Sequence, residues 1–280
     1  MPGARRERLS PVTEEPLAEF SKRRGDPVLV YCGLIDHDAA SRVYEVLRGA
    51  GRLPRLDLVL ITRGGVASAA WRLALLIHEF TDHLTVLVPH RAWSAGTLVC
   101  LSAHELVFGP MAELSPLDPQ IGAAGDNAAA GPSTVSAEDI RAFRDVAGEW
   151  FGADDPATRA QTLSLLSQRV SPLSLGAFLR ADRFVRQVAD DLLAPHIPDA
   201  GDRGRLVERL VSGYHSHSHA ITRRQARALG LRVTDADADE ESLLWDIAQW
   251  CQAEMYRDDE VSSRVWAEGM PMNPARRTPW

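Results

Sequence analysis

A serine between a predicted strand and a predicted helix is the residue best suited to nucleophilic chemistry. Ser94 lies in the run Trp93-Ser94-Ala95-Gly96-Thr97, where the following Ala-Gly pair favours a sharp backbone turn. The next amides, beginning with Ala95, would point outward at a helix N-terminus and could stabilise a developing oxyanion. Serine is also a favoured N-cap residue, so an ordinary helix cap is the alternative.

Two adjacent glycines occupy a second turn between a predicted strand and a predicted helix. Gly64 and Gly65 follow the apolar run 56–62. Because they have no Cβ, a backbone N–H there can approach a ligand closely. The second donor of an oxyanion hole could therefore be the amide of Gly65 or of Val66. A tight turn without chemistry is the alternative.

Apolar runs alternate with helical patterns through the first half of the chain. The predicted strands are 27–33, 56–62, 84–89 and 105–109, and the predicted helices between them lie within 36–49, 66–80 and 94–103. This alternation predicts a parallel sheet with helices on both faces. Because the crossovers are right-handed, all strand-to-helix turns lie at one edge of the sheet. We therefore expect the glycine pair and Ser94 to converge.

The same patterns predict how the chain is divided. We expect a flexible N-terminal arm over residues 1–26, one α/β domain over 27–257 and a loose C-terminal tail over 258–280. Within the domain, the glycine- and alanine-rich run 122–137 predicts a flexible loop over a site. The segment 138–211 has a helical pattern and predicts helical additions to the sheet.

Composition argues against several classes of protein. The net charge of −7 disfavours nucleic acid or an anionic membrane as the main partner. The three cysteines form no CxxC pair, so they suggest neither a disulfide framework nor a zinc site. No apolar run is long enough to span a membrane, and the N-terminus has no apolar signal segment, so we expect a cytoplasmic protein.

No cofactor is expected either. No G-x-G-x-x-G fingerprint for a dinucleotide follows a predicted strand. A pyridoxal phosphate enzyme needs a Schiff-base lysine, and the only lysine, Lys22, precedes the first predicted strand and is a poor candidate.

Three runs in this order resemble a known family: LVLITRGG at 58–65, VPHRAWSAGT at 88–97 and ELSPLDPQ at 113–120. They are similar to the serine dehydrogenase proteinase family of the Clp protease/crotonase superfamily, which is related to signal peptide peptidase A. The resemblance implies a Clp/crotonase-like α/β spiral with a parallel sheet and helical additions. It also implies a serine hydrolase, a peptidase that acts on peptides or unfolded segments as a homo-oligomer.

The resemblance further suggests which groups activate Ser94. Signal peptide peptidase A and its kin use a lysine, and Lys22 matches no lysine of that type. The catalytic histidine of the Clp protease corresponds in place to Asp118, 24 residues beyond Ser94, and its aspartate corresponds in place to the vicinity of His217. The resemblance thus implies a Ser94–His217–Asp118 triad with the two residue types exchanged, in which Asp118 orients His217 as the base.

Asp118 and the histidines around position 217 also fit roles without catalysis. Asp118 lies in Ser-Pro-Leu-Asp-Pro, which favours a turn. The alternating histidines at 215, 217 and 219 could bind a metal from one face of a strand, but no acidic or thiol residue has companion spacing, so no metal is expected. For the whole chain, a crotonase-type acyl-CoA enzyme, which needs no serine nucleophile, and a non-catalytic scaffold are the alternative functions.

Overall fold

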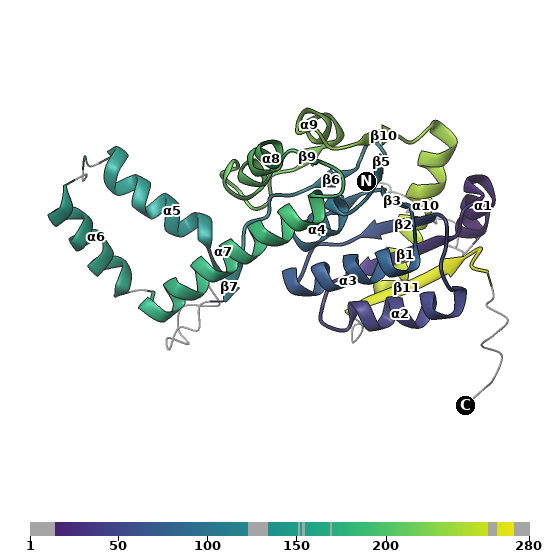
Figure 1. Ribbon diagram of the computed structural model, residues 1–280, viewed down its shortest axis with the longest axis horizontal. Helices are drawn as coiled ribbons and strands as arrows, with labels where there is room; N and C mark the ends of the chain where they lie inside the picture. Colours follow the sequence, from purple (N-terminus) through teal and green to yellow (C-terminus); the bar gives the residue numbers. More distant parts are fainter. Residues whose placement is uncertain are drawn as a thin grey trace, which may run out of the picture. The chain divides into compact units, whose positions relative to one another are not determined.

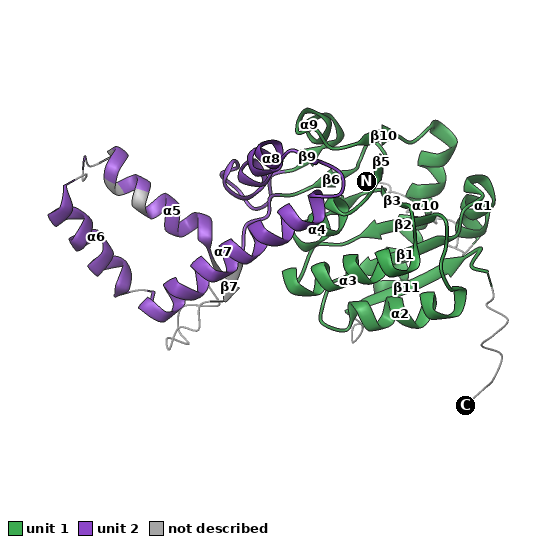
Figure 2. Ribbon diagram, viewed as in Figure 1, with its two compact units in different colours: residues 1–115, 220–280 green, residues 116–219 purple. Residues whose placement is uncertain are grey.

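The computed structural model describes residues 15–122, 134–150, 152, 155–168, 170–256 and 262–271. The chain divides into two compact units (Figure 2): unit 1 comprises 1–115 and 220–280, and unit 2 comprises 116–219. The sequence predicted a single domain over 27–257. In the structure, unit 2 is inserted in the chain between two stretches that together build unit 1.

A six-stranded sheet forms the centre of unit 1 (Figure 1), with the strand order β10-β5-β3-β2-β1-β11. Its parallel strands are β1 (Val28–Gly33), β2 (Leu56–Ile61), β3 (Leu84–Val88), β5 (Glu105–Phe108) and β10 (Val233–Asp235). The edge strand β11 (Ser263–Glu268) runs antiparallel to β1. Every residue of β2 and β3 is buried, as expected for strands that are covered on both faces. The predicted parallel sheet is therefore confirmed.

Helices pack on both faces of this sheet. They are α1 (Glu15–Arg24), α2 (Ala39–Ala50), α3 (Ala67–Phe80), α4 (Ala95–Leu101), α9 (Arg223–Ala228) and α10 (Ala238–Tyr256). Alternate β1 residues, Val28, Val30 and Cys32, share a buried cluster with apolar residues of α1 and α10. A second, three-stranded sheet has the order β4-β6-β9 and consists of β4 (Arg91–Ala92), β6 (Glu113–Leu114) and β9 (Ile221–Thr222).

Two segments outside the predicted domain contribute to unit 1. Residues 15–24, expected in the flexible arm, form α1, and its Leu17 and Phe20 are buried. Residues 263–268, expected in the loose tail, form β11 and pair along the whole of β1. Both elements depend on partners that are distant in the sequence. The remainder of the predicted arm and tail lies largely outside the described residues.

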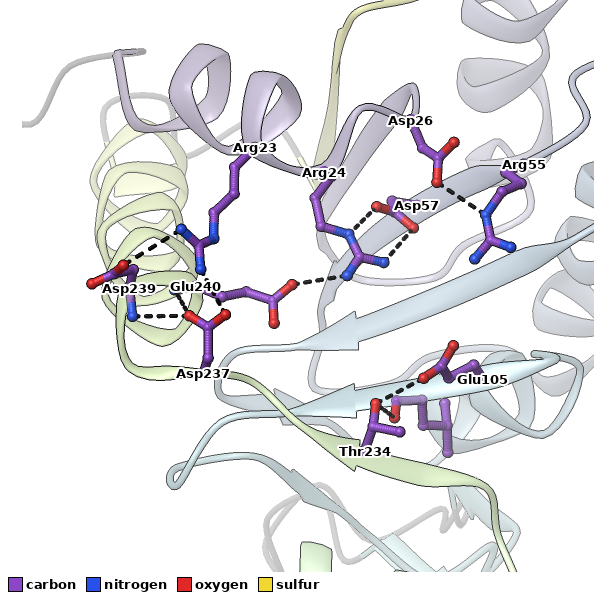
Figure 3. Close-up of polar contacts among 11 residues, drawn as sticks. Arg23, Arg24, Asp26, Arg55, Asp57, Glu105, Thr234, Asp237, Asp239 and Glu240 are labelled. Atoms are coloured by element: carbon purple, nitrogen blue, oxygen red, sulfur yellow. Dashed lines mark hydrogen bonds and ion pairs between the residues drawn. The ribbon is translucent and has the colours of Figure 1, made fainter.

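A buried ion network joins α1 to β2 and α10 (Figure 3). Arg24 donates hydrogen bonds to both carboxylate oxygens of Asp57, at 2.6 and 3.2 Å, and to Glu240 at 2.9 Å. The Asp57 side chain is fully buried, so its charge requires a partner of this kind. The bidentate geometry is the strong form of an arginine–carboxylate pair.

Unit 2 is mainly helical, as the pattern over 138–211 predicted. Its elements are β7 (Gln120–Gly122), β8 (Thr134–Ser136), α5 (Ala137–Asp145), the π-helix η1 (Val146–Trp150), α6 (Pro156–Ser167), α7 (Pro172–Leu193) and α8 (Ala200–Ser212). Ser136 begins α5 with a capping box completed by Asp139. Most of the predicted loop at 122–137 lies outside the described residues, but 134–136 form β8. None of the helices in the described residues is both long and apolar enough to cross a membrane.

Candidate active site

Ser94 lies between β4 and α4 in a strained backbone conformation. Its φ is 51° and its ψ is −112°, and it is the only non-glycine residue with positive φ in the described part of the chain. Such a conformation costs about 1–3 kcal/mol and persists only where the surroundings hold it. An ordinary N-cap residue has extended dihedrals and caps the helix with its side chain. Ser94 does neither, which argues against the simple cap.

Two buried hydroxyl groups hold this turn in place. The Ser94 amide donates to Oγ of Ser115 at 2.8 Å. Oγ1 of Thr97 lies 3.0 Å from the carbonyl oxygen of Ala92 and 2.9 Å from that of Ser115, and it accepts the Ser115 amide at 3.2 Å. Sequence reasoning missed these roles. The signal was available, because Thr97 and Ser115 lie in two of the motifs that carry the family resemblance.

Gly64, the first glycine of the pair, lies directly beside the serine, as the crossover rule predicted. A β-carbon at Gly64 would stand 2.9 Å from both Cβ of Ser94 and the carbonyl oxygen of Trp93. A β-carbon at Gly65 would stand 2.2 Å from the carbonyl oxygen of Ile35. Both glycines have φ values, +105° and +147°, that L side chains rarely adopt. Neither position therefore accepts a side chain without rearrangement.

The amides around the turn differ in their availability. The Val66 amide, one of the expected oxyanion donors, instead donates to the carbonyl oxygen of Ile35 at 2.8 Å. The Gly64 amide donates to Oγ1 of Thr62 at 2.9 Å. The amides of Gly65 and Ala95 donate to none of the residues that the structure describes. Of the expected donors, these two are the ones left for a ligand.

Asp118 and His217 both lie in unit 2, close enough to interact electrostatically. Burial raises the pKa of the Asp118 carboxyl, whereas hydrogen bonds from Ser136 and Glu138 and the nearby positive charge of His217 lower it. Asp118 accepts the Glu138 amide at 3.3 Å. Among the described residues no hydrogen bond joins Asp118 to His217, and Nδ1 of His217 is buried without a partner.

The expected triad is thus distributed over both units. The structure brings Asp118 and His217 into one unit, whereas Ser94 belongs to the other, so the triad as a whole stays a prediction. Residues 215–219 form turns and not the strand that the metal alternative requires. In the described part of the chain no group of three or more His, Cys, Asp or Glu residues could hold a metal ion.

Part of the chain that includes the Ser94 turn is similar to a known family. Residues 25–142 match the family described as ClpP-like SDH-type serine proteinase. An uncharacterized Methanocaldococcus jannaschii protein, MJ1495, is 40% identical over 81 residues, 28% of each chain. A second one, MJ0137, is 27% identical over 217 residues, 78% of this chain and 65% of the relative. The chain therefore spans less than two thirds of the length of either relative.

A solved structure is also similar. A mutant of the 1510-N membrane-bound stomatin-specific protease matches with a TM-score of 0.46 and 16% identity, covering 76% of this chain and 80% of that one. The family match includes both glycines, Ser94 and Asp118, whereas His217 lies beyond it. Residues 25–142 are thus similar to the ClpP-like SDH-type serine proteinase family, and the sheet of unit 1 is mainly parallel within an α/β fold.

Proposed function

We propose that this chain is a serine peptidase in which Ser94 attacks the carbonyl carbon of a peptide bond. The observation that carries the proposal is the strained Ser94 backbone, with φ of 51°, packed against a glycine that has no room for a side chain. Strain of this kind gathers at functional sites, because a residue with a purely structural role gains nothing from it. The family match over 25–142 supports the same class of reaction.

In this proposal the amides of Gly65 and Ala95 bind the oxyanion. Both are without an acceptor among the described residues, so neither has to break a bond to receive substrate. A preorganised donor of this type contributes about 10²–10³-fold to kcat in serine proteases. Val66 is not assigned this role, because its amide is already bonded to Ile35.

We assign His217 as the general base and Asp118 as the group that orients it. A serine hydroxyl is a weak nucleophile without a neighbouring base. An adjacent carboxylate favours the imidazolium that forms when histidine takes the serine proton. Catalytic hydrogen bonds often tighten only when substrate binds, so we expect the bond between Asp118 and His217 to form in the substrate complex.

Chain connectivity supports the assignment. The chain leaves unit 1 after Ser115, whose hydroxyl binds the Ser94 amide, and reaches Asp118 three residues later. It returns at β9, where Ile221 pairs with Leu114, four residues after His217. Along the chain, Asp118 and His217 thus lie three and four residues from residues that belong to unit 1.

A fluorophosphonate probe tests the nucleophile. We expect the probe to label the wild-type protein and the Ser68→Ala control, which alters an exposed serine of α3, but not Ser94→Ala. Intact-mass spectrometry would measure the adduct, and His217→Ala should label more slowly than wild type. An unlabelled, folded wild-type protein would refute the proposal. Acyl-CoA binding by such an unlabelled protein would favour the crotonase-type alternative, which needs no serine nucleophile.

A further inference from the structure

Two arginines beside the Ser94 turn have no carboxylate partner. Arg63 is exposed and immediately precedes Gly64, and Arg91 is partly buried three residues before Ser94. Neither forms an ion pair with a described residue. Several other arginines of unit 1 are bonded to carboxylates, as Arg24 is to Asp57 (Figure 3). The guanidinium groups of these two arginines, which are close to Ser94 and Gly64 in the sequence, are therefore available to a ligand.

Arg91 is held in place by neighbouring rings. Its guanidinium carbon lies 4.7 Å from the centre of the Trp93 ring, and its Nη2 lies 2.9 Å from Nε2 of His90. Arginine can only donate, so Nε2 accepts and the neutral His90 ring carries its proton on Nδ1. Stacking on an aromatic ring fixes the guanidinium plane without using its N–H groups. Arg91 is thus oriented in advance and keeps donors for a second partner.

The surroundings of these arginines contain more donors than acceptors. Nδ1 of His90 and Nε1 of Trp93 are both buried without a partner in the described part of the chain. Glu113 lies opposite Arg91 in the β4–β6 pairing, but no ion pair joins them. Burial lowers the pKa of His90, and the charges of Arg91 and Arg63 lower it further, whereas Glu113 raises it. Both guanidinium charges therefore act near this ring. With Glu113 counted, the cluster keeps a net positive charge.

We propose that Arg63 and Arg91 form a subsite for a carboxylate next to the scissile bond of the substrate. The inference rests on the proposed peptidase function and names its substrate class: peptides with an aspartate or glutamate, or a free C-terminus, beside the bond that is cut. The subsite adjoins the nucleophile, because Gly64, next to Arg63, packs against Ser94. A planar guanidinium matches a carboxylate with two parallel hydrogen bonds, which makes this class of ligand the best fit.

Matched peptides test the subsite in the wild-type protein. Fluorogenic substrates would carry glutamate or its neutral isostere glutamine on either side of the cleaved bond, each with a free or an amidated C-terminus. We expect kcat/KM to be about tenfold higher for the preferred carboxylate, which corresponds to about 1.4 kcal/mol. The difference should lie mainly in KM and should shrink as salt is added. Preference for glutamate identifies the side chain as the source, and preference for the free terminus identifies the C-terminal carboxylate.

Three arginine variants supply the controls. Arg63→Gln and Arg91→Gln should each reduce the preference, and the double variant should abolish it. Arg91→Lys keeps the charge but loses the planar fork, so we expect it to retain only part of the preference. Arg72→Gln, which changes an exposed arginine of α3, should leave the preference unchanged.

An equilibrium binding measurement separates failure of the subsite from failure of the peptidase. Fluorescence anisotropy with Ser94→Ala would compare labelled glutamate and glutamine peptides without any hydrolysis. Equal affinity for all peptides would overturn the subsite, even if the fluorophosphonate probe still labels wild type. Conversely, selective binding of a carboxylate that depends on Arg63 and Arg91 would support the subsite even if no labelling occurs.

Discussion

The Ser94 turn requires a residue without a side chain at position 64 as much as it requires the serine itself. Gly64 and Gly65 were predicted to converge with Ser94 because the crossover rule places strand-to-helix turns at one sheet edge. Which of the neighbouring amides are free could not be predicted. That choice depends on the bond from Val66 to Ile35 and on the Ser115 hydroxyl, both of which are tertiary contacts.

A methyl group at Gly64 should therefore disable the site. In Gly64→Ala the new β-carbon meets Cβ of Ser94 and the Trp93 carbonyl oxygen at 2.9 Å and also requires a positive φ. We expect destabilisation of about 1–3 kcal/mol and a loss of fluorophosphonate labelling of at least about 100-fold. Gly49→Ala is the matched control, because nothing lies within 4 Å of a β-carbon there. Labelling and urea unfolding measure both effects, and wild-type labelling of Gly64→Ala would contradict the close packing.

At the scale of elements, the sequence predicted the strands whose positions are set by a local apolar run. β1, β2, β3 and β5 are continuous apolar runs, and their predicted positions are confirmed to within a residue or two. α1 and β11 were missed, because β11 pairs with β1 across more than two hundred residues, from Val28 to Glu268. The bond from Arg24 to the buried Asp57 likewise depends on the packing of α1 beside β2, which local sequence does not specify.

The ion network of Figure 3 should matter more to stability than an exposed ion pair. Arg24→Met would leave the Asp57 charge buried in β2 with no partner, and we expect a loss of about 3 kcal/mol. Arg52→Gln breaks a pair with Asp82 in which both side chains are more than half exposed, so it should cost less than about 1 kcal/mol. Urea unfolding measures both free energies.

A double variant distinguishes the buried charge from lost packing. Arg24→Met combined with Asp57→Asn removes both charges, so it should recover part of the stability that Arg24→Met loses. If the double variant is no more stable than the single one, the contribution of Arg24 comes from the packing of its side chain and its bond to Glu240.

At the scale of the whole molecule, the insertion of unit 2 was not foreseeable. The runs at its limits, Ser115-Pro116-Leu117-Asp118-Pro119 and 212–218, contain Ser, Pro and Gly, but such runs are also typical of turns within one domain. The chain passes from strand β6 of unit 1 into unit 2 within two residues. The limits are set by the pairing of Leu114 with Ile221, which are far apart in sequence. The consequence is a chain whose two units have their own buried ionisable groups and can respond differently to pH.

Unit 1 should lose stability on acidification because of two partly buried histidines, His78 and His90. Burial lowers the pKa of His78 and His90 below 6.5, so the unfolded chain binds protons that the folded unit does not. The contribution of these two histidines to the stability of unit 1 is therefore fully present above pH 6.5 and is lost as the pH falls below that value. In unit 2 the raised pKa of Asp118 acts with the opposite sign, since it favours the folded state at acid pH and loses that contribution as the pH rises.

Hydrogen exchange resolved by peptide can follow both units between pH 7.5 and 5.5, after correction for the intrinsic exchange rate. We expect protection in unit 1 to fall more steeply than in unit 2. His78→Gln, whose amide can still donate to the Ser102 carbonyl oxygen, should flatten the decline in unit 1, whereas the exposed His37→Gln should not. His78 and His90 take up their protons only when unit 1 opens, so they can lower protection in unit 1 alone. An equal loss of protection in both units would therefore mean that these histidines do not govern the acid response.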